Sequence, residues 1–214
     1  VSGATGWNGG ALVHLLSARN VRVRALVRDR ARAAVLTSLP NVEIVEADMA
    51  HPETQTQALR DVDRAMLVSS SDPAMLEVQS NFIDAARKAG VKHVVKLSGI
   101  MPDIDSLFRF ARMHGEIERK LKRSGMAFTH LRAGEFMHAY FRQVPAIVAR
   151  GAFFLPMENA RIASIDIGDI AEVAAAALTE SGHEGKIYPL TGPEALSMTE
   201  VAEKLSAATG KTIQ

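Results

Sequence analysis

Apolar runs alternate with helix-like patterns over the first two thirds of the chain. The runs that we expect to form strands cover residues 21–27, 42–46, 65–68, 91–97 and 127–131. The patterns with helical spacing cover residues near 30–38, 53–59, 74–89 and 107–123. Strands rich in Val, Leu and Ile, with little alternation, are typical of a parallel sheet buried on both faces. The alternation therefore predicts an α/β fold, a doubly wound parallel sheet with helices on both faces.

Helix boundaries carry local signals. One long expected helix stops at Gly90, a residue type that favours the end of a helix. In the last third of the chain, two capping-box patterns, Asp169-x-x-Glu172 and Ser197-x-x-Glu200, each precede an apolar pattern with helical spacing. These two patterns predict structural helix caps.

The candidate domain boundary is a Pro- and Gly-bearing stretch over residues 145–156. We expect a core over residues 1–144 and a remainder over residues 145–214 that forms a small lobe, packed on the core as one integrated domain. Both termini are expected to be truncated. Only two residues precede the first glycine, whereas a buried strand usually needs about five or six, and the sequence ends at "ATGKTIQ", where another strand is expected.

Composition narrows the class of protein. The 214 residues are 47% hydrophobic and 23% charged, which is typical of a globular chain. A net charge of +1 gives no indication of nucleic acid or an anionic membrane as a partner. The absence of cysteine excludes disulfides and thiolate metal sites, and no apolar run reaches the length of a membrane span. We therefore expect a cytoplasmic protein; composition does not predict its oligomeric state.

Three glycines follow one another at three-residue spacing in the opening segment "VSGATGWNGG". Without a Cβ atom, such a turn can adopt positive φ and bring backbone N–H groups against a bulky anion, next to the positive end of the following helix. The motif therefore predicts a Rossmann-type site for a dinucleotide pyrophosphate. The residues expected to form it are Gly3, Thr5, Gly6, Trp7, Asn8 and Gly9. Trp7 has two interpretations. Its side chain either covers the phosphates or only shields the loop from water.

Arg28 stands at the end of the second expected strand, where the ribose specificity of such sites is determined. A carboxylate there would accept bonds from the free ribose hydroxyls of NAD, whereas a guanidinium can bind the extra phosphate of NADP. The sequence therefore favours NADP(H) over NAD(H). The alternative is that Arg28 is a solvated residue that opens a charged helix. Asp29 is able to contact a ribose, which leaves dual specificity open.

With these motifs, the chain resembles the NmrA-like branch of the atypical short-chain dehydrogenases/reductases. That branch includes NADPH-dependent quinone and triphenylmethane reductases and redox-sensing regulators. The resemblance extends over nearly the whole chain. The segments that carry it are "GATGWNGG", "ALVRD", "EADM", "MLVSSSDP", "VVKLSG", "HGEIERKLKRSGMAFTHLRAGEFM", "IDIGDIAEVAAAAL" and "YPLTGPEALSMTEVA".

The resemblance implies positions for the remaining parts of the cofactor. It implies adenine near Asp48 and Met49, the nicotinamide ribose near Ser69, Ser70 and Ser98, and the nicotinamide near Gly134, Glu135 and Phe136. Ligands in open α/β sheets bind beyond the carboxyl ends of the strands, which agrees with these positions. Strand-end serines also cap backbone groups, so Ser98 has a structural interpretation as well.

The sequence departs from the family pattern in its acid–base residues. Typical short-chain dehydrogenases use Tyr-x-x-x-Lys, yet neither Tyr140 nor Tyr188 has a lysine four residues later. In the family pattern His114 takes the place of that lysine, and Glu118 lies one helical turn further on. Alcohol dehydrogenation and sugar epimerisation are therefore disfavoured, because both need a proton moved in step with the hydride.

His114 has a functional and a structural interpretation. As a catalytic or cofactor-binding residue it contacts the nicotinamide ribose or gives a proton to the reduced acceptor. As a structural residue it is a solvated position on a basic helix face. A metal site is not expected, because only His114 and Glu118 are placed together and no third ligand is indicated.

Two hypotheses about function follow. The first is an NADPH-dependent reductase that passes hydride directly to a small apolar acceptor such as a quinone, whose delocalised charge allows protonation from water or His114 afterwards. The second is a non-catalytic redox sensor that binds NADP(H) and acts through a protein partner. A nucleotide-sugar epimerase is a third and weaker alternative.

Overall fold

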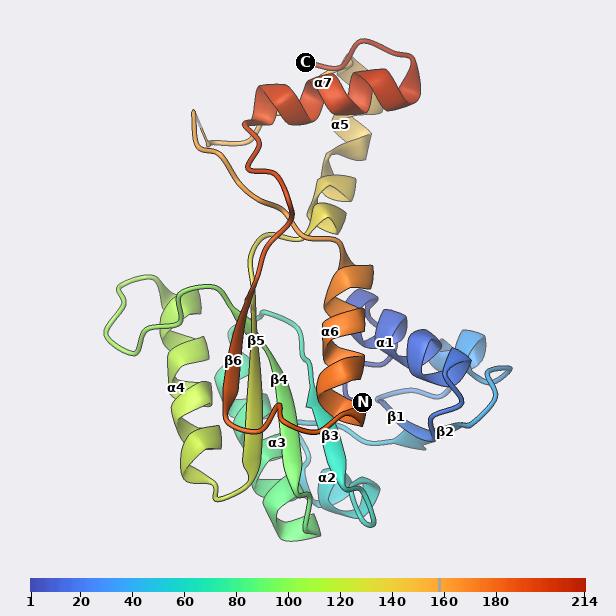
Figure 1. Cartoon of the computed structure of the whole chain (residues 1–214). Coiled ribbons are helices and arrows are strands. Elements are labelled where there is room, and N and C mark those ends of the chain that lie inside the picture. Colours follow the sequence, from blue (N-terminus) through green and yellow to red (C-terminus); the bar gives the residue numbers. More distant parts are fainter. Residues whose placement is uncertain (158) are drawn as a thin grey trace. The chain divides into compact units, whose positions relative to one another are not determined.

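A computed structural model describes residues 1–157 and 159–214 of the chain, as Figure 1 shows. The strands are β1 (Val23–Val27), β2 (Val42–Glu46), β3 (Arg64–Leu67), β4 (His93–Gly99), β5 (Ala127–Ala133) and β6 (Lys186–Leu190). The α-helices are α1 (Trp7–Ala18), α2 (Pro52–Ala58), α3 (Met75–Ala89), α4 (Arg109–Arg123), α5 (Val144–Arg150), α6 (Ile167–Thr179) and α7 (Met198–Thr209). Two 3-10 helices are η1 (Ala31–Leu36) and η2 (Met137–Gln143).

The chain packs as two compact units. Unit 1 comprises Val1–Ala133 and Gly168–Pro189, and unit 2 comprises Gly134–Ile167 and Leu190–Gln214. The predicted functional division, with a cofactor-binding core up to residue 144, stays a prediction, because packing does not show what either part binds.

The strands of unit 1 form parallel pairs. β1 pairs with β2, β3 pairs with β4 and β4 pairs with β5, while β6 extends the order β3-β4-β5-β6. The first two residues join the two sets of strands, since the Ser2 amide donates to the Met66 carbonyl at 3.0 Å and the Leu26 amide donates to the Val1 carbonyl at 2.9 Å. The opening residues therefore take the place of a strand between β1 and β3.

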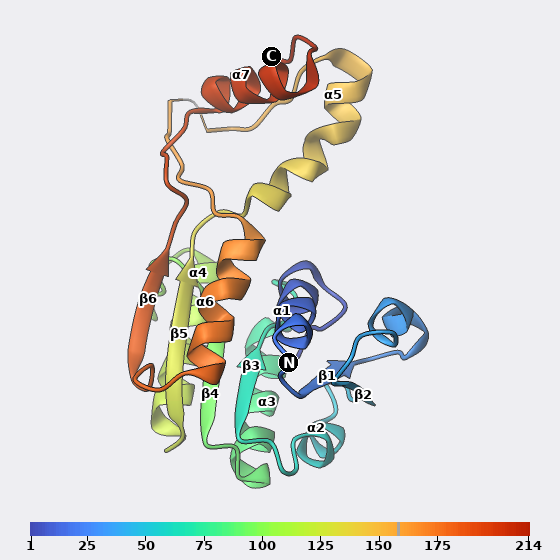
Figure 2. The same ribbon diagram turned by 45° about the vertical axis from the view of Figure 1, so that its right-hand side comes forward.

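Helices cover both faces of this sheet. In Figure 2, α1 and α6 lie on the near face, and α3 and α4 lie on the far face. All seven residues of β4 are buried, as expected for a central parallel strand that helices cover on both faces. The doubly wound, Rossmann-type α/β fold is confirmed.

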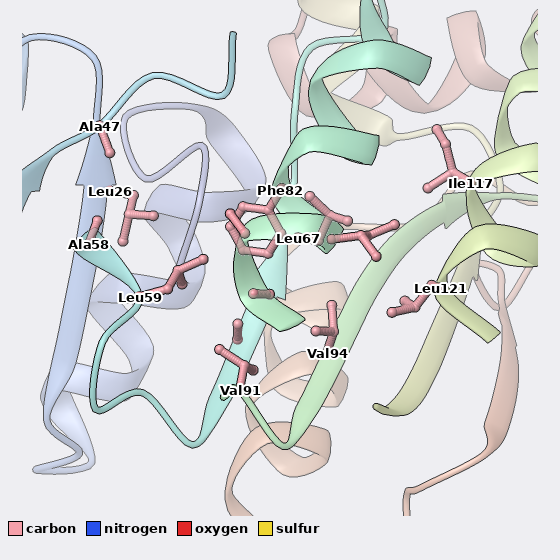
Figure 3. Packing of buried hydrophobic residues seen from close by; sticks show 14 of the residues in the cluster. Leu26, Ala47, Ala58, Leu59, Leu67, Phe82, Val91, Val94, Ile117 and Leu121 are labelled. Carbon is pink, nitrogen blue, oxygen red and sulfur yellow. The ribbon is translucent and has the colours of Figure 1, made fainter. Parts of the chain in front are cut away.

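An extensive apolar cluster lies between the sheet and the helices α3 and α4. Phe82 of α3 packs with Leu67 of β3 and Val94 of β4, and α4 contributes Ile117 and Leu121 to the same buried cluster, which Figure 3 shows in close view. This core fixes α4 against β4. The arrangement matters for function because both elements carry polar side chains near the carboxyl end of the sheet.

Of three local expectations, one is met by a different type of helix, one is wrong and one is confirmed. The segment near residues 30–38 forms the 3-10 helix η1, whose buried residues Ala33 and Leu36 lie three positions apart, as one side of a 3-10 helix requires. Asp169 lies inside the first turn of α6, which begins at Ile167, so it does not cap the helix. The Ser197 capping box is present, with the Ser197 amide donating to Glu200 Oε2 at 2.8 Å.

Unit 2 contains η2, α5 and α7. Its small apolar core consists of Phe153, Val201, Ala202 and Ile213. Within the described residues of the whole chain, no helix combines the length and the apolar character needed to cross a membrane.

Candidate functional site

The glycine-rich turn before α1 is tightly closed. Gly3 has a φ of 61°, and its carbonyl accepts a hydrogen bond of 2.9 Å from the Gly6 amide. A Cβ atom on Gly9 would lie only 2.2 Å from the Gly3 carbonyl oxygen and 3.0 Å from the Ala4 nitrogen. A side chain at position 9 is therefore incompatible with this turn. The helix can begin directly behind the loop because glycine is present.

The start of α1 presents positive potential without a carboxylate to neutralise it. The first turn contains no acidic residue, and Gly6 at the cap supplies no side-chain acceptor. Thr5 and Gly6 are exposed, and Trp7 is 49% exposed. Asn8 Oδ1 is enclosed and has no hydrogen-bond partner in the described chain. The turn therefore offers backbone donors and one unsatisfied acceptor, a combination that suits a phosphate group flanked by a hydroxyl.

Arg28 directly follows the last residue of β1 and is exposed. Its guanidinium makes no hydrogen bond or ion pair with the residues that the structure describes. The neighbouring Asp29 accepts a hydrogen bond of 2.8 Å from the Ala31 amide at the start of η1. Asp29 therefore supports the turn, while the charge of Arg28 is available to an external anion.

The four residues expected near adenine and ribose follow two other strands of unit 1. Asp48 and Met49 lie just after β2, and Ser69 and Ser70 lie just after β3. Because the carboxyl ends of parallel strands face the same edge of a sheet, these residues lie at the edge that also carries the glycine turn. Ser69 Oγ accepts a hydrogen bond of 2.9 Å from Gln79 Nε2, which fixes its orientation.

A cluster of buried and partly buried polar side chains lies where α4 crosses β4 and β5. The strand register pairs Lys96 with His130 and Ser98 with Arg132. Residues two apart on a strand share one face. The hydrogen bonds of this cluster join it to His114 and Glu118 of α4. We call these six residues the α4–sheet cluster; its members are Lys96, Ser98, His114, Glu118, His130 and Arg132.

Glu118 is the anion of the α4–sheet cluster. Arg132 donates to both of its oxygens, from Nη2 to Oε2 at 2.7 Å and from Nε to Oε1 at 3.1 Å, and Ser98 Oγ donates to Oε1 at 2.8 Å. Burial raises the pKa of Glu118, but the hydrogen bonds from Arg132 and Ser98 and the neighbouring positive charges outweigh it and lower the pKa. Glu118 therefore stays ionised near neutral pH.

His114 is neutral in this environment. Burial lowers the pKa of His114 to about 3, and the positive charge of Lys96 acts in the same direction. Lys96 Nζ lies 2.7 Å from His114 Nδ1. His114 is 5% exposed, and its Nε2 has no hydrogen-bond partner in the described part of the chain. The solvated-face interpretation of His114 is therefore wrong, because α4 packs this side of the helix against the sheet.

Gly99 allows the ring of His114 to approach the end of β4. A Cβ atom at position 99 would lie 3.0 Å from His114 Cδ2 and 2.9 Å from Phe110 Cε1. Phe110 contacts His114 edge-on, with ring centroids 4.5 Å apart. The unpaired side of the imidazole therefore lies at the carboxyl end of the central strand.

Two groups of expected residues have different surroundings. The hydroxyl of Ser98 is directed into the α4–sheet cluster, where it holds Glu118. Gly134, Glu135 and Phe136 belong to unit 2, where the Gly134 amide donates to the Leu190 carbonyl at 2.9 Å and Phe136 forms a bridge with Ile165.

Comparison with known proteins decides the family. The sequence profile of the NmrA-like family matches residues 1–214. The chain belongs to the NmrA-like family. The NAD(P)H azoreductase of Xenophilus azovorans is 39% identical over 214 residues, which cover 100% of this NmrA-like chain and 74% of that protein.

Two solved structures share the fold of this NmrA-like protein at high similarity. The NADPH-dependent quinone oxidoreductase QOR2 of Escherichia coli, complexed with NADPH, has a TM-score of 0.89 at 33% identity and covers 100% of this chain and 76% of that one. The Citrobacter sp. triphenylmethane reductase complexed with NADP(H) has a TM-score of 0.87 at 27% identity, covering 99% and 76%.

Three residues of the NmrA-like site escaped the sequence analysis, namely Lys96, Gly99 and Arg132. A signal for Lys96 was present, because this lysine directly follows two valines in a strand expected to be buried on both faces, and a buried lysine needs a partner. Nothing local in the sequence pairs Arg132 with Glu118. Among the residues that the structure describes, no three potential ligands gather into a metal site.

Proposed function

We propose that this NmrA-like protein is an NAD(P)H-dependent reductase that passes hydride directly to a small apolar conjugated acceptor such as a quinone. The observation that carries the proposal is the closed glycine turn, in which a Cβ on Gly9 would meet the Gly3 carbonyl oxygen at 2.2 Å. Relatives named as an azoreductase and a quinone oxidoreductase support the reaction class. When bound, the reduced nicotinamide supplies the hydride.

Arg28 favours NADP(H) over NAD(H) in this proposal. Its exposed guanidinium lies at the end of β1, without an internal partner among the described residues, and can hold a phosphate through two parallel hydrogen bonds. Asp29 is occupied with the start of η1. This supports a phosphate contact through Arg28 more than a ribose contact through Asp29.

The other contacts follow from the edge of the sheet at which these residues lie. We assign the pyrophosphate to the glycine turn, adenine to Asp48 and Met49, and the ribose to Ser69 and Ser70. We also assign Ser98 to the nicotinamide ribose; its hydroxyl donates to Glu118 Oε1 at 2.8 Å and so orients that carboxylate as well. We assign the nicotinamide to Gly134, Glu135 and Phe136.

An apolar acceptor is supported by the loop between β4 and α4. Five large apolar side chains in this loop are exposed, up to 97% for Leu107. They are Ile100, Met101, Ile104, Leu107 and Phe108. Exposed apolar side chains in the loop that leads into α4 suit a flat apolar ligand better than a sugar.

We assign His114 as the proton source. The tyrosine that donates the proton in typical short-chain dehydrogenases is replaced here by Phe110. Phe110 lies four residues before His114, the spacing of the tyrosine in Tyr-x-x-x-Lys, and its ring has no hydroxyl. A neutral imidazole that carries its proton on a nitrogen without a hydrogen-bond partner can protonate an acceptor after hydride transfer. A conjugated acceptor tolerates this order because it delocalises the added charge.

The test is nicotinamide absorbance after the protein is mixed with NADPH and a panel of quinones, azo dyes and cationic triphenylmethane dyes. Oxidation of NADPH that depends on the acceptor supports the reductase. Tight NADPH binding without oxidation by any acceptor contradicts it and supports the sensor that acts through a protein partner. Absence of NADPH binding contradicts both hypotheses.

A further inference from the structure

We propose that Lys96 is a positioning residue that holds His114 with its proton on Nε2 and replaces that proton after His114 has given it to the reduced acceptor. This inference rests on the proposed function, because it assigns the proton that completes the reduction. It concerns a lysine on β4, outside the residues that the sequence indicated.

The first argument is the hydrogen bond between the two side chains. Lys96 Nζ lies 2.7 Å from His114 Nδ1 and 3.2 Å from the Leu97 carbonyl oxygen. An ammonium group has three N–H donors and no acceptor. It must therefore donate to Nδ1, and a neutral imidazole whose Nδ1 accepts carries its proton on Nε2. Lys96 in this way fixes the tautomer that presents a donor toward the carboxyl end of β4.

The second argument is the set of charges around Lys96. Glu118 from α4 and His130 and Arg132 from β5 face it. Glu118 is already held by Arg132 and by Ser98, so its negative charge is largely compensated. Burial lowers the pKa of His130 to about 4, which keeps His130 neutral. No carboxylate is therefore dedicated to Lys96.

The consequence is an ammonium group that gives up its proton near neutral pH. Lys96 is fully buried, and burial lowers the pKa of its amine to about 7, against the raising effect of Glu118. Its ordinary value is near 10.5. A lysine this easy to deprotonate suits a proton reservoir better than a fixed counter-ion.

The proton step balances. The acceptor, which is the oxidant, gains a hydride from the reduced nicotinamide and then takes the proton from His114 Nε2. Nδ1 takes a proton from Lys96 Nζ as the Nε2–H bond breaks. Lys96 is left as a neutral amine and His114 as a neutral ring with its proton on Nδ1. The reverse transfer, with Nε2 taking a proton from water, restores both groups.

The test is the 15N NMR spectrum of the histidine side chains in the protein without cofactor, recorded between pH about 5.5 and about 9. His114→Gln identifies the signal. At the lower end of this pH range, we expect His114 Nδ1 to accept a hydrogen bond and His114 Nε2 to carry the proton. As the pH rises through about 7, where Lys96 loses its proton, the Nδ1–H form should increase, because a neutral amine can accept from Nδ1.

Substitutions at Lys96 sharpen this test. Lys96→Met should remove the transition near pH 7, and Lys96→Arg should hold the Nε2–H form over the whole range, since a guanidinium stays charged. Lys92→Met is the matched control, because Lys92 lies on the same chain segment but is exposed and pairs with Asp63. The inference is overturned if the wild-type His114 carries its proton on Nδ1 at pH about 6, or if Lys96→Met leaves the transition unchanged.

Turnover separates this inference from the proposed function. If acceptors are reduced, the wild-type rate should fall as the pH rises through about 7 and the Lys96→Arg rate should not. A rate profile that is the same in both proteins overturns the relay. If no acceptor is reduced but the NMR transition depends on Lys96, the proposed function fails while the positioning of His114 by Lys96 holds. Should Lys96→Met fail to fold, the wild-type titration still decides.

Discussion

Arg132 holds both oxygens of the Glu118 carboxylate, at 2.7 and 3.1 Å, from a neighbouring strand beneath α4. Removing one member of a buried ion pair leaves an uncompensated charge. We expect Arg132→Met to lower the free energy of unfolding by roughly 3 kcal/mol, as measured by urea denaturation at neutral pH. Arg123→Met, at the exposed end of α4, is the control and should change stability by less than about 0.5 kcal/mol. Equal losses in the two variants would contradict a structural role for the pair.

The glycine turn gives a second prediction. Gly9→Ala places a Cβ atom 2.2 Å from the Gly3 carbonyl oxygen, so the turn must open. We expect NADPH affinity to fall at least about 10-fold, because the backbone donors no longer converge on one anion. The fluorescence of Trp7, the one tryptophan of the chain, can report the titration from within the turn. Gly10→Ala is the matched control, because its Cβ meets the nearest atom, the Ala4 carbonyl oxygen, at 3.3 Å.

Arg28 provides the prediction on cofactor choice. Arg28→Ala should weaken NADPH binding by about 10- to 100-fold, since a charge-assisted hydrogen-bonded pair contributes about 1.5 to 3 kcal/mol, and should leave NADH binding nearly unchanged. Arg22→Ala, at the exposed amino end of the same strand region, controls for loss of charge. Equal weakening of NADPH and NADH by Arg28→Ala would show that the side chain does not contact the phosphate.

The sheet and its helices could be predicted because their signals are local. Apolar runs identified the buried strands, Gly90 ended α3 with a φ of 82°, and the Ser197 capping box formed as expected. The Asp169 pattern failed because α6 begins two residues earlier, at Ile167, and Glu172 pairs with Arg19 of α1.

The α4–sheet cluster could be predicted only in part. His114 and Glu118 share a helix face by spacing, so the sequence brought these two together. Lys96 and Arg132 reach them through the packing of α4 on two strands, and the neutral state of His114 results from that burial. The lysines and arginines of α4 suggested a solvated helix face, but Arg119 and Lys122 are exposed while His114 on the same helix is buried.

Gly99 provides a prediction that separates catalysis from binding. Gly99→Ala adds a methyl group 2.9 Å from Phe110 Cε1 and 3.0 Å from His114 Cδ2. We expect His114 to be displaced and kcat to fall about 10- to 100-fold, while NADPH affinity changes little. Phe110→Leu removes one of the two clashing atoms and should restore part of the rate in the double variant. If kcat is unchanged in Gly99→Ala, catalysis does not require His114 at the position that the structure shows.

His130 determines part of the acid sensitivity of the fold. Both of its ring nitrogens are enclosed and lack hydrogen-bond partners in the described structure. Burial lowers the pKa of His130 to about 4, below the ordinary value of 6.5. The unfolded chain therefore binds more protons between these two values, and the free energy of unfolding must decrease as the pH falls through this window.

Replacing His130 should accordingly flatten the pH dependence. His130→Leu removes the titrating group and two unsatisfied nitrogens while keeping an apolar side chain against Phe128, whose ring stacks on His130 at 4.7 Å. We expect urea denaturation to show a smaller loss of stability between pH about 6.5 and about 4.5 than in the wild type. His51→Leu, at an exposed site, should retain the wild-type slope. If both variants keep that slope, the acid sensitivity comes from the other buried histidines, His93 and His114, whose lowered pKa values act in the same direction.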